Sequence, residues 1–432
     1  MTTSPFWLLL LTLLVPIPYS TDRHGRRVPF VTYTLIGLNV LVYLFTGPTS
    51  YEHWGLVPSA PHFSALLTGL FLHIGLAHLL GNMLFLWIFG RHVEEALGWQ
   101  AFLALYLGGG IAAGLLHLAV VLLHGTDTSV PLVGASGAIS AILAPFAVRF
   151  HRASIRMFWV PAALFFRNWA VLEVPAVSGL VLWICWNVVG GICFLWLPDS
   201  FSAQHPWLQL LLPPTKTAYW AHVGGFVFGL VAAELTGLLR DGRQDYLLQD
   251  ARTAAAKGAA DFAAAVRSYR AFLEFDPDNA PIRAELARLL AVPALSDAKA
   301  IEEARIEAGL EMLAAIRAFL KREETPEAAR RTAETLSLGL ALPLTPRERL
   351  RLGVAAEGLG EPETALVLLR ALVVETPDAP EDEMARLKLG ELLRTRDPQE
   401  AKAVLTEFLA KYPNSDWAWR VEEMQSQMQT NI

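Results

Sequence analysis

The chain has 432 residues, of which 53% are hydrophobic and 18% are charged, and its formal net charge is −6. The negative charge and the lack of a basic stripe interleaved with aromatic residues argue against nucleic-acid binding. Up to about Arg240 the sequence is apolar and rich in aromatic residues, whereas Glu, Arg, Ala and Leu dominate beyond it.

The N-terminal segment, residues 1–22, contains a short apolar run from Pro5 to Pro18. This run is shorter than the roughly 20 residues that span a bilayer. It also lacks the basic start and the small-residue cleavage site of a signal peptide. We expect it to lie at the membrane interface or to insert loosely.

Six apolar segments in residues 23–240 predict an all-α bundle with six transmembrane helices. They are Val28–Phe45, Leu76–Phe89, Ala101–Leu123, Gly134–Phe150, Val177–Leu197 and Thr217–Leu239. The second and fourth are short, which favours tilting or a locally thin bilayer. A further apolar piece, Met157–Phe166, is too short to cross and is expected to be an interfacial connector.

Basic residues between these segments predict the orientation of the bundle. They gather at alternate connections, as Arg23, Arg26, Arg27, Arg91, Arg149, Arg152, Arg156, Arg240 and Arg243. The connections Tyr51–Gly75, His124–Leu132 and Pro198–Lys216 contain a single basic residue, Lys216. Because basic loops stay in the cytoplasm, we expect a multi-pass protein of the cell or inner membrane with both termini cytoplasmic.

Ser136 and His222 are polar residues on two of the predicted spans, each with glycines beside it. A polar group in lipid is costly unless it finds a partner or water, so such residues are candidates for function. Both spans run from outside to inside in the predicted topology. Ser136 and His222 are therefore expected at one depth, just below the outer surface, where a serine and a histidine can form a nucleophile and its base.

Small residues around this pair favour close helix contact, namely Gly134 and Gly137 on one span and Gly224 and Gly225 on the other. These glycines either serve the site or only pack helices, and the sequence leaves both open. For Gly229, which completes a G-x-x-x-G spacing, packing alone is favoured.

His78 and Asn82 are four residues apart and therefore share one face of the second span. They can donate hydrogen bonds toward one point, as the oxyanion of an acyl-transfer intermediate requires. The alternative is that they bond neighbouring helix backbones. Their expected depth, matching that of Ser136 and His222, favours the oxyanion interpretation.

Four sequence blocks resemble the rhomboid family of intramembrane serine proteases over roughly residues 23–240. They are HIGLAHLLGN at 73–82, GRHVEEALG at 90–98, GASGAI at 134–139 and AHVGGFVFG at 221–229. The resemblance implies a Ser–His dyad without an acidic third member and without a metal or cofactor. Ser136 would be the nucleophile and His222 the general base, with His78, Asn82 and the backbone N–H of Ser136 at the oxyanion. Transmembrane proteins would be the substrates.

Two positions qualify the resemblance. Glu94 is expected to be structural, bonding the loop backbone between the second and third spans. Position 140 is Ser140, where some relatives carry an aromatic residue that stacks on the histidine. What orients the His222 ring is therefore open, with Tyr219 or Trp220 as candidates.

Residues 241–432 predict a cytoplasmic helical domain with apolar residues at i, i+3 and i+4 spacing. Pro377 and Pro413 end similar helices and lie 36 residues apart (413 − 377), close to the tetratricopeptide period of about 34. This part resembles degenerate tetratricopeptide hairpins, although Val292–Leu342 departs from the period. Such repeats present a groove to a partner, so we expect a cytoplasmic peptide or protein partner.

The alternative function is a catalytically inactive rhomboid-like adaptor that binds membrane helices and recruits partners through its repeats. The presence of both Ser136 and His222 argues against it.

Overall fold

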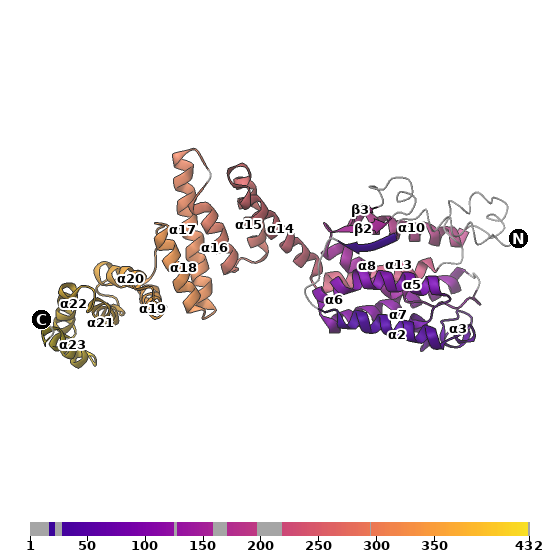
Figure 1. The fold of residues 1–432 in the computed structure, drawn as a ribbon, viewed down its shortest axis with the longest axis horizontal. Coiled ribbons are helices and arrows are strands. Elements are labelled where there is room, and N and C mark those ends of the chain that lie inside the picture. Colours follow the sequence, from indigo (N-terminus) through magenta and orange to yellow (C-terminus); the bar gives the residue numbers. More distant parts are fainter. Residues whose placement is uncertain are drawn as a thin grey trace. The chain divides into compact units, whose positions relative to one another are not determined.

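The computed structural model describes residues 17–21, 28–124, 128–158, 171–196, 218–293 and 295–430. The chain divides into two compact units, Met1–Arg243 and Gln244–Ile432. In Figure 1 the first unit carries the indigo to magenta colours and the second the salmon to yellow ones.

Helices form most of the N-terminal unit (Figure 1). In chain order they are α2 (Phe30–Phe45), α3 (Thr49–Trp54), α4 (Ala65–Thr68), η1 (Gly69–Phe71), α5 (Leu76–Phe85), η2 (Leu86–Gly90), α6 (Arg91–Leu97), α7 (Trp99–His124), α8 (Ser136–Arg149), α10 (Ala176–Trp196), α13 (Tyr219–Leu235) and α14 (Leu238–Ala256), the last of which continues into the second unit.

Each of the six apolar segments predicted to cross the bilayer contains a helix. By length and composition, two described helices could cross a membrane, and four candidates result if each of two bent helix pairs counts as one span. The helices α2 and α8 are apolar but shorter; the 16 residues of α2 extend about 24 Å, less than a typical hydrocarbon core. The chain is thus a helical membrane protein, while six crossings stay a prediction.

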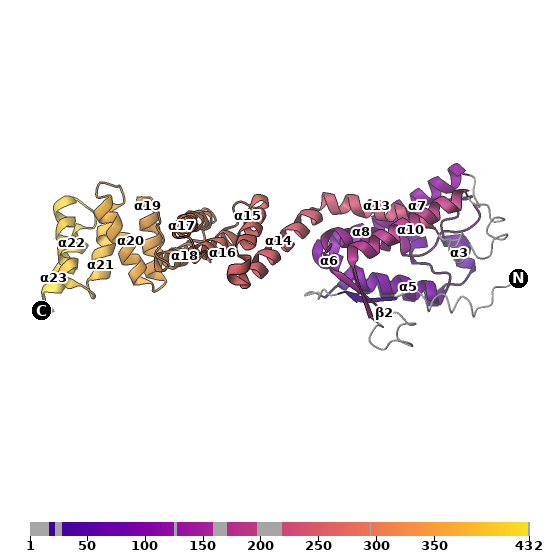
Figure 2. The same cartoon turned by 90° about the horizontal axis from the view of Figure 1, so that it is seen from above.

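Helix α8 lies at the centre of the unit, because every residue from Gly137 to Phe146 is buried. It packs against α7 and α13, which are seen close to it in Figure 2. Small side chains allow this close approach: a Cβ added at Gly109 of α7 would lie 2.2 Å from the Ala141 Cβ of α8. A tightly packed helix therefore carries Ser136 at its first position.

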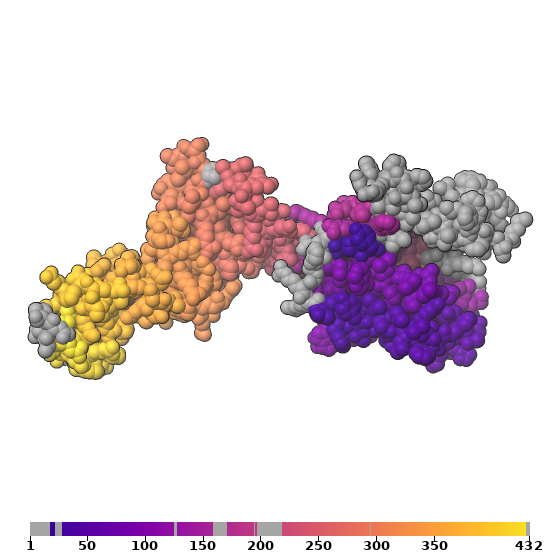
Figure 3. Space-filling model, viewed as in Figure 1, coloured from indigo at the N-terminus to yellow at the C-terminus, as the bar shows by residue number. Residues whose placement is uncertain are grey.

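A small antiparallel sheet corrects the all-α prediction. Its strands are β1 (Ile17–Thr21), β2 (Ser154–Phe158) and β3 (Val171–Pro175), in the order β1-β2-β3. The indigo atoms of β1 lie on the surface of the unit in Figure 3, and Thr21 Oγ1 lies 2.9 Å from His92 Nε2 of α6. Local periodicity missed the sheet because β1 and β2 are distant in sequence. The connector predicted at Met157–Phe166 begins within β2, and its residues 159–166 lie outside the described residues, as do residues 5–16 of the N-terminal apolar run.

Glu94 stabilises the start of α2, which corrects the partner expected for it. Its carboxylate accepts hydrogen bonds from the backbone N–H groups of Val31 and Thr32, each at 2.8 Å, and from Thr32 Oγ1 at 2.6 Å. The first N–H groups of a helix lack partners within the helix and carry partial positive charge. A buried carboxylate from α6 therefore completes α2, rather than the loop between the second and third spans.

The C-terminal unit consists of helices that pack against their neighbours in sequence. After η3 (Gly258–Asp261) they are α15 (Phe262–Phe275), α16 (Ala280–Ala291), α17 (Ala298–Lys321), α18 (Thr325–Ser337), α19 (Pro346–Gly358), α20 (Pro362–Glu375), α21 (Asp382–Leu393), α22 (Pro398–Lys411) and α23 (Ala418–Thr430). The 24-residue α17 explains why the sequence between Val292 and Leu342 departs from the repeat period.

Ion pairs join side chains about one repeat apart in this unit. Arg252 contacts Glu285, Arg317 contacts Glu348 and Arg370 contacts Glu400. Each pair is partly exposed, so its direct contribution to stability is small. Because the partners in each pair are separated by a similar number of residues, the pairs also favour one alignment of each helical hairpin against the next.

Candidate active site

Ser136 lies where an extended loop turns into α8. Gly134, two residues earlier, has φ +119°, a backbone conformation that side chains other than glycine rarely adopt. Its N–H donates to the carbonyl of Gly69 at 2.9 Å, which anchors the loop to η1. Ser136 is the first residue of the helix, so its backbone N–H is one of those with no partner inside the helix.

His222 meets Ser136 from the first turn of α13. The distance between His222 Nε2 and Ser136 Oγ is 2.9 Å, a hydrogen bond between residues 86 positions apart in the chain. Both side chains are partly buried. The structure thus brings together the two residues that the sequence singled out, in the geometry that a nucleophile and its base require.

The His222 ring has two further contacts, both from α10. Its Nδ1 lies 2.6 Å from Asn187 Oδ1, and its centroid lies 5.7 Å from that of Trp183, with the rings tilted by 36°. Tyr219 and Trp220, the candidates from sequence, instead lie against Gly190 and Gly191 of α10. Sequence reasoning overlooked Asn187, although an amide within an apolar segment is itself a reason for attention.

His78 and Asn82 approach the loop that precedes Ser136. A Cβ at Gly134 would lie 2.6 Å from His78 Cε1 and 3.6 Å from Asn82 Nδ2. Asn82 Nδ2 lies 2.9 Å from Nε2 of His73, which is fully buried. Helix α5 therefore directs both side chains toward the loop before Ser136, and His73 contacts the Asn82 amide.

The predicted glycines face different neighbours. A Cβ at Gly225 would lie 2.0 Å from the Gly137 carbonyl oxygen of α8, whereas one at Gly224 would lie 2.9 Å from Leu116 Cβ of α7. A Cβ at Gly137 would lie 2.6 Å from Ala113 Cβ, also on α7. The predicted contact between α8 and α13 thus involves Gly225 and Gly137, whose Cβ would also lie 3.7 Å from the Ala221 carbonyl oxygen of α13. Gly224 instead faces α7, because adjacent helical residues point about 100° apart.

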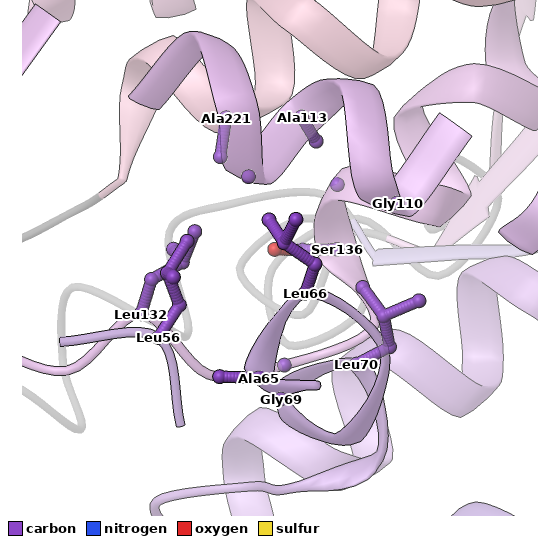
Figure 4. A pocket seen from close by; sticks show the side chains of 13 residues that line it. Leu56, Ala65, Leu66, Gly69, Leu70, Gly110, Ala113, Leu132, Ser136 and Ala221 are labelled. Carbon is purple, nitrogen blue, oxygen red and sulfur yellow. The ribbon is translucent and has the colours of Figure 1, made fainter. Parts of the chain in front are cut away.

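A small cavity of about 20 Å³ lies beside Ser136, whose hydroxyl points into it in Figure 4. Its walls are apolar side chains and glycines, including Leu66 and Leu70 from α4 and η1 and Ala221 from α13. This volume is enough for about one water molecule. Within the part of the chain that the structure describes, no cluster of three or more His, Cys, Asp or Glu side chains is arranged to hold a metal ion.

Comparison with known proteins agrees with these features. Residues 60–238 match the family model of the Rhomboid domain, and residues 384–415 match a tetratricopeptide repeat. Rhomboid protein 1, mitochondrial, of Saccharomyces cerevisiae is 32% identical over 243 residues, which cover 52% of this chain and 61% of the yeast protein.

Two further relatives match shorter stretches. Presenilin-associated rhomboid-like protein A, mitochondrial, of Danio rerio is 32% identical over 114 residues, covering 26% of this chain and 29% of that protein. Rhomboid protease GluP of Bacillus subtilis is 33% identical over 132 residues, covering 28% of this chain and 24% of that protein. The matches thus span less than two thirds of each relative. The chain belongs to the rhomboid family and has a tetratricopeptide-like C-terminal region.

Proposed function

We propose that the chain is an intramembrane serine endopeptidase that cleaves transmembrane proteins near the outer membrane face. The observation that carries this proposal is the 2.9 Å contact between Ser136 Oγ and His222 Nε2, made between two apolar helices. A hydroxyl and an imidazole at this distance support nucleophilic catalysis. The similarity to a Bacillus subtilis rhomboid protease agrees with it.

In the proposed reaction, Ser136 Oγ attacks the scissile carbonyl carbon while its proton passes to His222 Nε2. The tetrahedral intermediate collapses, the C–N bond breaks, and the proton moves from Nε2 to the departing amine. Water then attacks the resulting ester and gives its proton to Nε2. That proton returns to Ser136 Oγ as the ester bond breaks and the carboxylic product leaves.

His78, Asn82 and the backbone N–H of Ser136 are proposed to stabilise the oxyanion. The approach of both side chains to Gly134 supports this role. We expect Asn82→Ala to lower the cleavage rate by about 10²–10³-fold, the usual cost of removing one oxyanion donor, with His78→Ala also slowing it. Native rates in both variants would contradict the assignment.

The proposed arrangement has six membrane crossings and both termini in the cytoplasm. The basic residues at alternate connections support it. The cavity beside Ser136 is small and has apolar walls, so it suits a small side chain of the substrate. The tetratricopeptide-like region is proposed to recruit a cytoplasmic peptide or protein, since such repeats act in recognition.

A serine-directed fluorophosphonate probe on the detergent-solubilised chain tests the activity. The Ser136 oxygen forms a bond to phosphorus, fluoride leaves, and the serine proton passes to His222. We expect labelling of the wild type and none of Ser136→Ala. Ser140→Ala is the matched control, because Ser140 lies on the same helix and donates its hydroxyl proton to the Ser136 carbonyl oxygen at 2.7 Å. It should label like the wild type.

The second candidate is the inactive adaptor, which would use the same tetratricopeptide-like region to recruit partners. Well-folded wild type that takes up no probe, or a Ser136→Ala variant that labels like the wild type, would support the adaptor instead.

A further inference from the structure

We propose that Asn187 is a positioning residue for His222, so that the site operates as a Ser136–His222–Asn187 relay. This inference rests on the proposed function and extends it. Asn187 lies on α10, whereas Ser136 lies on α8 and His222 on α13. Three helices, rather than two, therefore each contribute one residue to this hydrogen-bonded group of side chains.

The amide of Asn187 is held in one orientation by two hydrogen bonds. Its Nδ2 donates to the carbonyl oxygen of Trp183, one turn earlier in α10, at 2.8 Å. Its Oδ1 then faces Nδ1 of His222 at 2.6 Å. Only 3% of Asn187 is exposed, so water does not compete effectively for either bond.

This orientation decides which ring nitrogen of His222 carries the proton. An amide oxygen can only accept a hydrogen bond, so Nδ1 must be the protonated nitrogen. The lone pair of Nε2 then points toward the Ser136 hydroxyl at 2.9 Å. This is the tautomer that a general base needs, and a partner on the far nitrogen is the usual means of selecting it.

The environment of the ring makes this partner important. The His222 ring also contacts the Trp183 ring, which offers no strong acceptor for an N–H. Ser140, at the position where some relatives carry a stacking aromatic residue, is already bonded to the Ser136 carbonyl oxygen. Without Asn187, His222 could rotate or protonate at Nε2, and either change removes the base from Ser136.

The contact between α10 and α13 places Asn187 at the required distance. A Cβ at Gly190 would lie 2.6 Å from the Tyr219 ring, and one at Gly191 would lie 2.9 Å from the Trp220 ring. Trp220 Nε1 also donates to the Gly191 carbonyl oxygen at 3.3 Å. Because these glycines follow Asn187 by about one turn, the two helices are in close contact beside the relay.

Two variants of Asn187 remove its two hydrogen bonds separately. A serine can bond the carbonyl four residues earlier, so Asn187→Ser keeps the contact to Trp183 but cannot reach His222. Asn187→Asp keeps an oxygen opposite Nδ1 but loses the donor to Trp183. The matched control is Asn39→Ser in α2, because the Asn39 amide also donates to a carbonyl four residues earlier, that of Leu35, at 2.7 Å.

The measurement is fluorophosphonate labelling of the full-length chain over a range of probe concentrations. It separates the maximal labelling rate from the probe concentration at half-maximal rate. We expect Asn187→Ser to lower the maximal rate by at least about tenfold, since general-base catalysis commonly contributes about 10²–10⁴-fold, with the half-maximal concentration unchanged. Asn187→Asp should retain more of the rate than Asn187→Ser, and Asn39→Ser should match the wild type. Thermal unfolding of each variant is measured in parallel, and only variants that are folded at the assay temperature are compared.

Any of four results would overturn the relay. Three of them are a wild-type maximal rate in Asn187→Ser, an equal loss in Asn39→Ser, and a change confined to the half-maximal concentration. Asn187→Asp that is no faster than Asn187→Ser would also contradict it. Folded wild type that takes up no probe is a different failure, because it refutes the proposed function and the relay together.

Discussion

Replacing Gly225 by alanine is expected to separate His222 from Ser136. A Cβ at Gly225 would lie 2.0 Å from the carbonyl oxygen of Gly137, and real Cβ contacts essentially never fall below 3.0 Å. The atom that it meets belongs to the backbone of the buried stretch of α8, which cannot rotate away as a flexible side chain can. Helix α13 must therefore move from α8 by about 1 Å, and overpacking of this kind is also destabilising.

The magnitude follows from the position of the clash. Gly225 lies three residues after His222, and Gly137 directly follows Ser136. A displacement of about 1 Å at this point lengthens the Ser136–His222 contact from 2.9 Å to about 3.9 Å, beyond hydrogen-bonding distance. Misplacement by about 1 Å commonly costs about 10²-fold in rate.

The assay is the maximal fluorophosphonate labelling rate of the full-length chain, with thermal unfolding measured in parallel. Gly37→Ala is the matched control, because Gly37 is also inside an apolar helix and a Cβ there meets nothing within 4 Å. We expect about a 10²-fold loss for Gly225→Ala and a native rate for Gly37→Ala. A native rate in Gly225→Ala, or an equal loss in the control, would refute the reasoning.

Three further predictions concern stability. Glu94→Gln should lower the free energy of unfolding by about 1.5–3 kcal/mol, because the carboxylate accepts three hydrogen bonds at the start of α2; an unchanged detergent-unfolding midpoint would contradict this. Asp382→Ala should cost about 3 kcal/mol in urea unfolding of the C-terminal unit, since it removes a fully buried carboxylate from Arg386, which is itself 5% exposed; a loss under about 0.5 kcal/mol, typical of surface pairs, would refute it. The hydrogen bond from Arg252 lowers the pKa of Glu285. The stability from Glu285 is therefore complete above the ordinary Glu pKa of about 4.3 and is lost as the pH falls through the lowered value. Glu285→Gln should therefore make the free energy of unfolding depend less on pH in this acidic range.

Several features of this protein were predictable from the sequence because they depend on local pattern. Long apolar runs give helices at the six expected places, since a helix satisfies its own backbone hydrogen bonds. Polar residues in such runs are costly and therefore conspicuous, which is why Ser136 and His222 could be paired before their distance was known. The proline spacing likewise indicated the tetratricopeptide-like region, which the match at residues 384–415 confirms.

Other features required the tertiary structure, because they depend on which distant segments become neighbours. Strand β1 pairs with β2 across more than a hundred residues, and Glu94 of α6 completes α2 rather than its own loop. The partner of His222 on its far nitrogen is Asn187 of α10, a contact that no local spacing encodes. Sequence periodicity determines which residues share a helical face, whereas the crossing of packed helices determines what each face meets.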